Sequence, residues 1–138
     1  MKYFKIYLLL VLVLGFSCVT TKNAMSPTNN LGGYIKTNVV KKLNQNSNEV
    51  VVFGKIVNVK TKKPLVNSRV YIGCVKVETN ELGQYKFKFN KSIKKQTVSV
   101  SSIGYKKVET LFFDFDVDNL YKIDFFLEED NRPLLDCN

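Results

Sequence analysis

The chain has 138 residues, of which 45% are hydrophobic and 24% charged, and its 21 Lys and Arg against 12 Asp and Glu give a formal charge of +9. This composition is typical of one globular domain and argues against an intrinsically disordered chain or a membrane protein with several spans. The sequence contains no histidine. That absence removes the commonest general base, the Ser-His and Cys-His nucleophile pairs and the usual zinc ligand.

The first 17 residues have the pattern of an export signal. Lys2 and Lys5 precede an unbroken apolar run over residues 6–14. As a helix this run would span about 14 Å, roughly half of the hydrocarbon core of a bilayer, which is short for a membrane span but suits a signal peptide. We therefore predict a signal peptide over residues 1–17.

The predicted signal peptide ends at Cys18, which follows Gly15, Phe16 and Ser17. This stretch resembles a relaxed form of the lipobox of bacterial lipoproteins, in which the cysteine is lipidated and becomes the first residue. The resemblance implies lipidation of Cys18, and two or three acyl chains at about 0.8 kcal/mol per buried CH₂ would hold the protein on a membrane. Ordinary cleaved secretion and a retained N-terminal anchor are the alternatives.

Residues 18–48 are predicted to form a flexible tether. Both ends of this stretch are rich in Asn, Thr, Ser and Gly, so they offer little apolar surface to bury. Residues 34–43 within it are consistent with either a short helix or an added strand.

From residue 49 onward the hydrophobic pattern predicts β-strands. Strict alternation of apolar and polar residues, the pattern of a half-buried strand, occurs at residues 84–90, 97–101 and 120–127. Weaker strand patterns occur at residues 50–59, 68–72, 75–79 and 107–113. Turn-forming residues separate them at 61–64, 80–83, 90–95 and 114–119. About seven short strands with regular turns predict an all-β antiparallel sandwich.

Three short motifs occur in order within this region. The first contains Gly54, Pro64 and Leu65, the second Thr79, Gly83 and Tyr85, and the third ends in Gly104 and Tyr105. Together they resemble the carboxypeptidase regulatory-like domain, a transthyretin-like β-sandwich of exported bacterial proteins. The resemblance implies a seven-stranded Greek-key sandwich over residues 49–128, followed by a C-terminal tail over residues 129–138.

The motif residues have structural roles that elementary chemistry explains. Pro64 would fix φ at the end of a turn, and Gly83 would supply the positive φ of a tight hairpin. Leu65 would cap the edge of the sandwich, while Gly104 would permit a bend beside a partly buried Tyr105. Asn58 and Asn80 stand where the family has Asp. These two residues keep turn-forming hydrogen bonds but lose a charge.

The chemistry known for related domains finds no matching residues here. Hydroxyisourate hydrolysis by transthyretin-like enzymes and the zinc site of carboxypeptidases both need histidines. Asp114, Asp116 and Asp118 superficially resemble a calcium loop, but Asn119 and Phe125 occupy the positions where that loop needs Gly and Glu. We therefore expect no metal, no cofactor and no catalytic residue.

Two cysteines remain besides Cys18. In an oxidising compartment Cys74 and Cys137 could form a disulfide that ties the tail to the sheet, or both could stay as thiols. The sequence leaves both alternatives open.

These observations predict a non-catalytic lipoprotein whose sandwich serves as an interaction or structural module of the bacterial cell envelope. The residues after Cys18 (VTTKN) lack the acidic pair that can direct lipoproteins to the cell surface, which favours the periplasmic side of the outer membrane. We expect an envelope protein partner and no nucleic acid, because the chain is exported. A carbohydrate-binding module and, less favoured, a small hydrolase are the alternatives.

Overall fold

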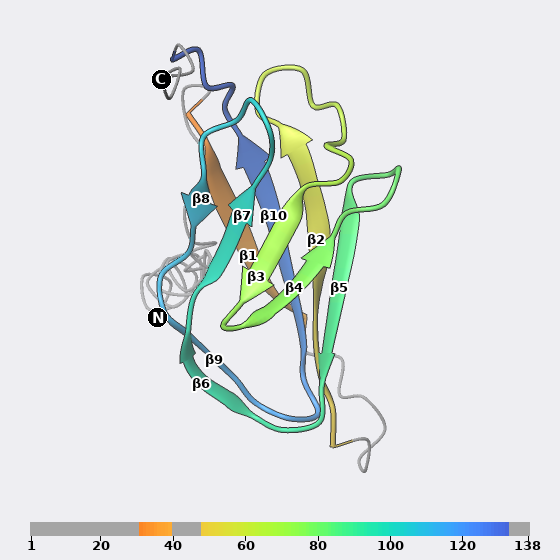
Figure 1. The fold of residues 1–138 in the computed structure, drawn as a ribbon. Coiled ribbons are helices and arrows are strands. Elements are labelled where there is room, and N and C mark those ends of the chain that lie inside the picture. Colours follow the sequence, from red (N-terminus) through yellow and green to blue (C-terminus); the bar gives the residue numbers. More distant parts are fainter. Residues whose placement is uncertain (1–30, 40–47, 133–138) are drawn as a thin grey trace, which may run out of the picture.

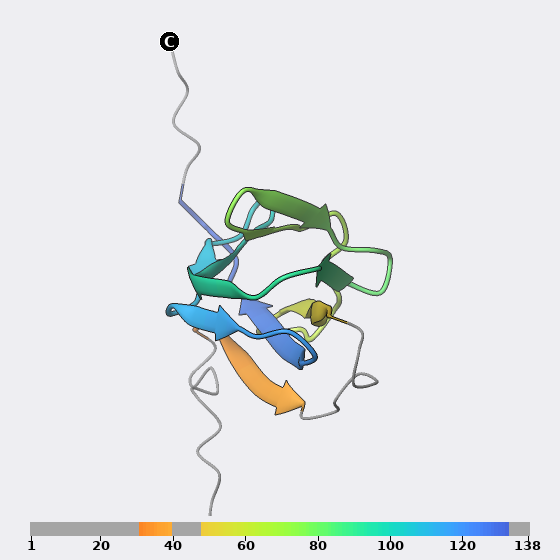
Figure 2. The same ribbon diagram turned by 90° about the horizontal axis from the view of Figure 1, so that it is seen from below.

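The computed structural model describes residues 31–39 and 48–132, and all the regular secondary structure in this part of the chain is β. Its ten strands are β1 (Gly33–Val39), β2 (Val50–Asn58), β3 (Arg69–Ile72), β4 (Val75–Glu78), β5 (Gln84–Phe89), β6 (Ile93–Gln96), β7 (Val98–Ser101), β8 (Val108–Glu109), β9 (Phe113–Phe115) and β10 (Leu120–Leu127). They form two four-stranded sheets, in the orders β1-β10-β2-β5 and β4-β3-β7-β8, and a β6-β9 ribbon (Figure 1). Figure 2 shows the sheets as layers. The predicted all-β class and sandwich arrangement are confirmed.

The core lies between the two sheets and is built by the alternation seen in the sequence. In β5, Tyr85 and Phe87 are buried while Lys86 and Lys88 are exposed. The two sheets and the ribbon contribute the fully buried apolar side chains, which are Val50, Val52, Ile56, Val70, Val98, Val100, Phe115, Ile123, Phe125 and Leu127. Because the strands have period two, one face of each sheet collects the apolar residues and removes them from water.

One central strand pairing corrects the predicted antiparallel sandwich. β10 runs parallel to β2, with Leu120 opposite Val51 and Leu127 opposite Asn58. The other ladders of the described strands are antiparallel, and these residues contain ten strands where about seven were predicted. Alternation predicts that a segment is extended, but it carries no information about the direction of its partner.

The segment predicted as one strand over residues 107–113 is instead divided between two sheets. At Thr110 the hydroxyl accepts the amide of Val98, and the next amide, of Leu111, donates to the hydroxyl of Tyr34. These two hydroxyls take the place of backbone partners in the ladder. The chain therefore pairs with β7 only as far as β8 and then continues as β9, which pairs with β6. The predicted turn over residues 90–95 correspondingly contains the start of β6, and the turn over 114–119 begins inside β9.

The N-terminal strand resolves the alternatives left open for residues 34–43. Gly33–Val39 forms β1, which pairs antiparallel with β10 along its whole length and places Tyr34 in the core. The predicted continuous tether over residues 18–48 is therefore wrong at residues 33–39, because burial of Tyr34 favours adding this strand to the sheet. Residues 18–30 and 40–47 lie outside the described residues.

Three turns meet at one end of the sandwich, formed by residues 59–68, 79–83 and 102–105, and we call this surface the turn end (Figure 1). The hydroxyls of Ser68 and Ser102 lie 3.0 Å apart, which joins the first turn to the third. β1 enters its sheet at this same end, since Gly33 is opposite Phe126 near the end of β10. The β6-β9 ribbon lies at the opposite end (Figure 1).

Candidate functional site

The second motif organises the turn end around Thr79, whose side chain is buried. Its hydroxyl donates to the carbonyl oxygen of Leu65 at 2.6 Å and accepts the amide of Ser68 at 2.9 Å. The Leu65 side chain is also buried and belongs to the core. Thr79 thus uses its hydroxyl to hold the turn that precedes β3 against the turn that follows β4.

Gly83 completes this junction for a steric reason as well as a conformational one. Its φ is +68°, as predicted for a tight turn. A Cβ atom on Gly83 would lie 2.6 Å from the carbonyl oxygen of Ile56 and 3.0 Å from Cβ of Pro64. The glycine therefore allows the β4–β5 turn to pack directly on the end of β2.

The third motif meets the end of β2 through Asn58, which is buried. The side-chain nitrogen of Asn58 donates to Oε1 of Glu129 at 2.8 Å and to the hydroxyl of Tyr105 at 3.3 Å. Its side-chain oxygen accepts the amides of Lys60 and Thr61 at 2.8 and 3.0 Å. The sequence predicted the turn-forming bonds of Asn58 but not its contact with Glu129, which comes from the far end of the chain.

Gly54 and Tyr85 lie in mid-sheet, away from the turn end, where the β2–β10 ladder is interrupted. A Cβ atom on Gly54 would lie 1.9 Å from the carbonyl oxygen of Ile123, and the hydroxyl of Tyr85 donates to that same oxygen at 2.7 Å. The carboxylate of Asp124 accepts the amide of Lys55 at 3.0 Å. Burial raises the pKa of Tyr85 well above its usual value, and the negative charge of Asp124 acts in the same direction.

An open hollow of about 670 Å³ lies beside these residues. It is lined by β2, β5 and β10 and also by Val77 and Glu78 of β4 and by Asn80 of the turn that follows. Val51, Phe53 and Leu120 supply apolar surface. Phe53 lies opposite Lys86 of β5 and Lys122 of β10, so its ring is flanked by two basic side chains. We call this surface the lysine hollow.

The charges of the lysine hollow are only partly neutralised within the chain. Lys122 pairs with Asp124 at 3.2 Å. Glu78, which also lines the hollow, pairs with Arg69 at 3.9 Å and Lys76 at 3.3 Å. Lys55 and Lys86 also line the hollow, and neither has an ion-pair partner among the described residues. A surface with apolar side chains beside two unpaired ammonium groups is complementary to a ligand surface that carries both acidic and apolar groups. The alternation of residues 84–90 predicted that Lys86 faces solvent, but the strand order that brings it beside Phe53 could not be deduced from it.

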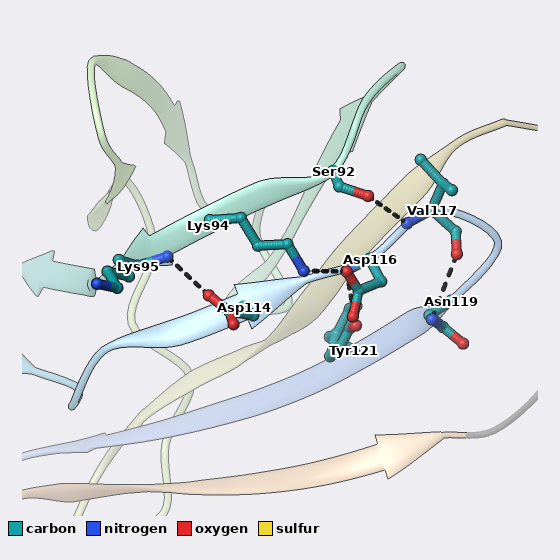
Figure 3. Close-up of polar contacts among 8 residues, drawn as sticks. All are labelled: Ser92, Lys94, Lys95, Asp114, Asp116, Val117, Asn119 and Tyr121. Atoms are coloured by element: carbon teal, nitrogen blue, oxygen red, sulfur yellow. Dashed lines mark hydrogen bonds and ion pairs between the residues drawn. The ribbon is translucent and has the colours of Figure 1, made fainter.

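Asp114 and Asp116 hold the β6-β9 ribbon (Figure 3), whereas Asp118 bonds to the segment that precedes β2. Asp114 accepts the amide of Lys95 at 2.8 Å, and Asp116 forms an ion pair with the Lys94 side chain. Asp118 accepts the amide of Asn48 at 3.1 Å. The described residues contain no group of three side chains placed to hold a metal ion.

A partly buried lysine beside this ribbon was not expected from the sequence. The side-chain nitrogen of Lys36 lies 3.9 Å from the ring centroid of Phe113 and 5.5 Å from that of Tyr121. Burial lowers the pKa of Lys36, while attraction to Asp114 opposes the shift. Such a contact between an ammonium group and aromatic faces stabilises the docking of β1.

The remaining predicted residues lie at the other motif positions or outside the described part. Gly104 has a φ of +79° in the turn closed by a hydrogen bond from the amide of Tyr105 to the carbonyl of Ser102. Cys74 is exposed at the turn between β3 and β4. Cys18 and Cys137 lie outside the described residues, so lipidation and the disulfide stay predictions.

Comparisons with known proteins give no family for this chain. No family model matches the sequence, and no curated protein matches it. Among solved structures, the chain is similar to hydroxyquinol 1,2-dioxygenase from Pseudomonas putida DLL-E4, with 9% sequence identity and a TM-score of 0.45. The match covers 77% of this chain and 59% of that one, less than two thirds of its length. Within residues 31–39 and 48–132, no helix has the length and hydrophobicity needed to cross a bilayer.

Proposed function

We propose that this protein is a lipid-anchored component of the bacterial cell envelope whose sandwich is a non-catalytic interaction module of the carboxypeptidase regulatory-like type, with a transthyretin-like topology. The observation that carries the proposal is the role of the motif residues. Leu65, Thr79 and Gly83 lock two turns together, and Tyr105 meets Asn58 at the end of β2. The motif residues thus build a rigid scaffold that presents surfaces for binding.

The buried hydroxyl groups of the motif residues have structural roles rather than the surroundings of a nucleophile. Those of Thr79 and Tyr85 both donate to backbone carbonyl oxygens, and among the described residues every buried side-chain nitrogen or oxygen has a hydrogen-bond partner. A nucleophile needs a neighbouring base within hydrogen-bond reach. These hydroxyls instead bond to carbonyl oxygens, which cannot remove a proton from them.

In this proposal the lysine hollow binds the envelope partner. Its apolar surface and the unpaired ammonium groups of Lys55 and Lys86 are complementary to an acidic, partly apolar segment of another protein. Phe53 lines the hollow, so we choose its position for a crosslinking residue that can capture the partner. A photo-crosslinking residue at this position in living cells is expected to yield one discrete adduct.

A charge reversal tests whether the hollow is the binding surface. Lys86→Glu should reduce the adduct at least several-fold, because it replaces attraction with repulsion at the hollow. Lys91→Glu is the matched control, since Lys91 is an exposed lysine between β5 and β6 and does not line the hollow. An adduct of equal yield in both variants, or no adduct from the chain that carries the crosslinking residue and retains both lysines, contradicts this assignment.

The anchor is tested separately by metabolic labelling with a palmitate analogue. The native protein should incorporate the label, Cys18→Ser should not, and Cys74→Ser should behave as the native protein does. Failure of the native protein to take up label, or retention of label in Cys18→Ser, contradicts the proposed anchor.

A further inference from the structure

Each of the three turns at the turn end exposes an aliphatic side chain. Val66 is 45% exposed, Leu82 64% and Ile103 98%. Tight turns normally place small or polar residues at such positions. The fold gives no packing reason for a fully exposed Ile103, so its side chain is available for contact with something outside the chain.

The three aliphatic residues are presented by one connected unit. The Ser68–Ser102 hydrogen bond joins the first and third turns, and the bond from Thr79 to Leu65 joins the first and second. Because these turns are already held in place, little conformational entropy is lost when they dock on a surface.

The same end carries unbalanced positive charge. Lys60 and Lys63 are exposed in the first turn, and neither has an acidic partner among the described residues. After β10, Glu128 is paired with Lys106 at 3.0 Å and Asp130 with Arg132 at 2.6 Å, whereas Glu129 keeps its negative charge because its hydrogen-bond partner, Asn58, is neutral. Among the described residues of this end, Glu81 and Glu129 are therefore the acidic side chains without a cationic partner, against Lys60, Lys62 and Lys63 of the first turn.

The chain also enters the sandwich at this end. Residues 19–32 separate Cys18 from Gly33, the first residue of β1. The tether predicted for this stretch would have a root-mean-square reach of roughly 20 Å. A lipid on Cys18 therefore places the bilayer within easy reach of the turn end. The tether also raises the effective concentration of the surface, so a weak contact suffices.

We propose that the turn end docks on the leaflet that holds the lipid anchor. Val66, Leu82 and Ile103 enter the head-group region, and Lys60 and Lys63 lie against anionic head groups. This inference rests on the proposed anchor, and it adds a second, non-covalent contact that orients the sandwich. Docking leaves the part of the lysine hollow on β2, β5 and β10 free for a protein partner, while Asn80 lies where the hollow adjoins the turn end.

The test uses the complete lipidated protein in vesicles of phosphatidylethanolamine and phosphatidylglycerol. A polarity-sensitive NBD label is attached at Ile103→Cys in a chain that also carries Cys74→Ser and Cys137→Ser. Phe112→Cys is the matched control, because Phe112 is 74% exposed on the connection between β8 and β9. Doxyl-labelled lipids should quench the label at position 103 several-fold more than the label at position 112.

The charge contribution is measured in the same vesicles. Replacing both lysines, as Lys60→Gln and Lys63→Gln, should lower the quenching at position 103 by roughly twofold or more. Replacing phosphatidylglycerol with phosphatidylcholine should have the same effect on the chain that retains both lysines.

Two outcomes overturn docking while leaving the anchor intact. One is a label at position 103 that is not quenched although mass spectrometry finds acyl chains on Cys18. The other is equal quenching at positions 103 and 112, which shows that the sandwich does not rest on its turn end. Absence of acyl chains from Cys18 overturns both the docking and the proposed function.

Discussion

The side-chain nitrogen of Asn58 lies 2.8 Å from Oε1 of Glu129 and ties the end of β2 to the segment that follows β10. The oxygen of the same side chain accepts two turn amides, so both ends of the amide are used. An aspartate here, as the family resemblance leads one to expect, could accept the turn amides but would face the Glu129 carboxylate. Asn58 therefore suits Glu129 because its neutral amide donates a hydrogen bond to the carboxylate, which an aspartate would repel.

Asn58→Asp is expected to lower the free energy of unfolding at pH 7 by about 2–4 kcal/mol. The substitution removes the hydrogen bond that the buried amide donates to the Glu129 carboxylate and places a second negative charge beside it. Repulsion raises the pKa of the introduced carboxyl, so the loss is present above that pKa and shrinks as the pH falls below it. Urea unfolding between pH 4 and 7 measures this. The double variant Asn58→Asp with Glu129→Gln restores a donor and should recover much of the stability, whereas equal urea midpoints for Asn58→Asp and the native chain would contradict the assignment.

Two glycines with similar backbone conformations are predicted to respond differently to alanine. Gly83 and Gly104 have φ values of +68° and +79°, but an added Cβ meets the Ile56 carbonyl oxygen at 2.6 Å in the first case and nothing within 4 Å in the second. Gly104→Ala should cost about 1–2 kcal/mol from backbone strain alone. Gly83→Ala should cost about 1–3 kcal/mol more, because overpacking adds to the strain.

Thermal or urea unfolding of the two glycine variants under the same conditions gives the comparison. A cost for Gly104→Ala equal to or larger than that for Gly83→Ala would show that the close packing of the β4–β5 turn on β2 is wrong.

The phenol of Tyr85 is expected to stay protonated in alkaline solution for as long as the protein is folded. Its folded pKa lies well above the usual value of 10.0, because burial and the nearby Asp124 disfavour the ionised form. A raised folded pKa means that this contribution to stability is complete below about pH 10 and is lost as the pH rises through the folded pKa. Absorbance at 295 nm should therefore show one tyrosine that ionises only with unfolding, and Tyr85→Phe should lack that step. A late step retained in Tyr85→Phe contradicts the prediction.

Two phenylalanines give a direct test of the sandwich. Phe87 is 2% exposed in the core and Phe112 is 74% exposed. Phe87→Ala should lower the free energy of unfolding by about 3–5 kcal/mol, because it removes a buried ring and leaves a cavity. Phe112→Ala should change stability by less than about 0.5 kcal/mol, as surface substitutions do. Similar melting temperatures for the two variants would contradict the assigned faces of β5.

The strands were predictable where the amino-acid pattern itself is regular. The alternation of residues 84–90 and 120–127 predicted which side chains of β5 and β10 are buried, because period two places every second residue on the same face. Residues 107–113 were mispredicted because Thr110 and Tyr34 supply hydroxyls that replace ladder partners. The position of Tyr34 depends on β10, far away in the sequence, so a local pattern does not contain it.

By itself the sequence determined the β-class, the inward faces of the main strands and the turn at Gly83. These properties depend on local chemistry, namely side-chain alternation and the conformational freedom of glycine. The signal peptide over residues 1–17 stays a prediction. Only the tertiary structure decided the parallel β2–β10 pairing, the contact of Asn58 with Glu129, the lysine hollow and the exposure of Val66, Leu82 and Ile103 on three turns of one end. Each of these joins residues that are distant in the chain, and such proximity arises from packing of the whole sandwich.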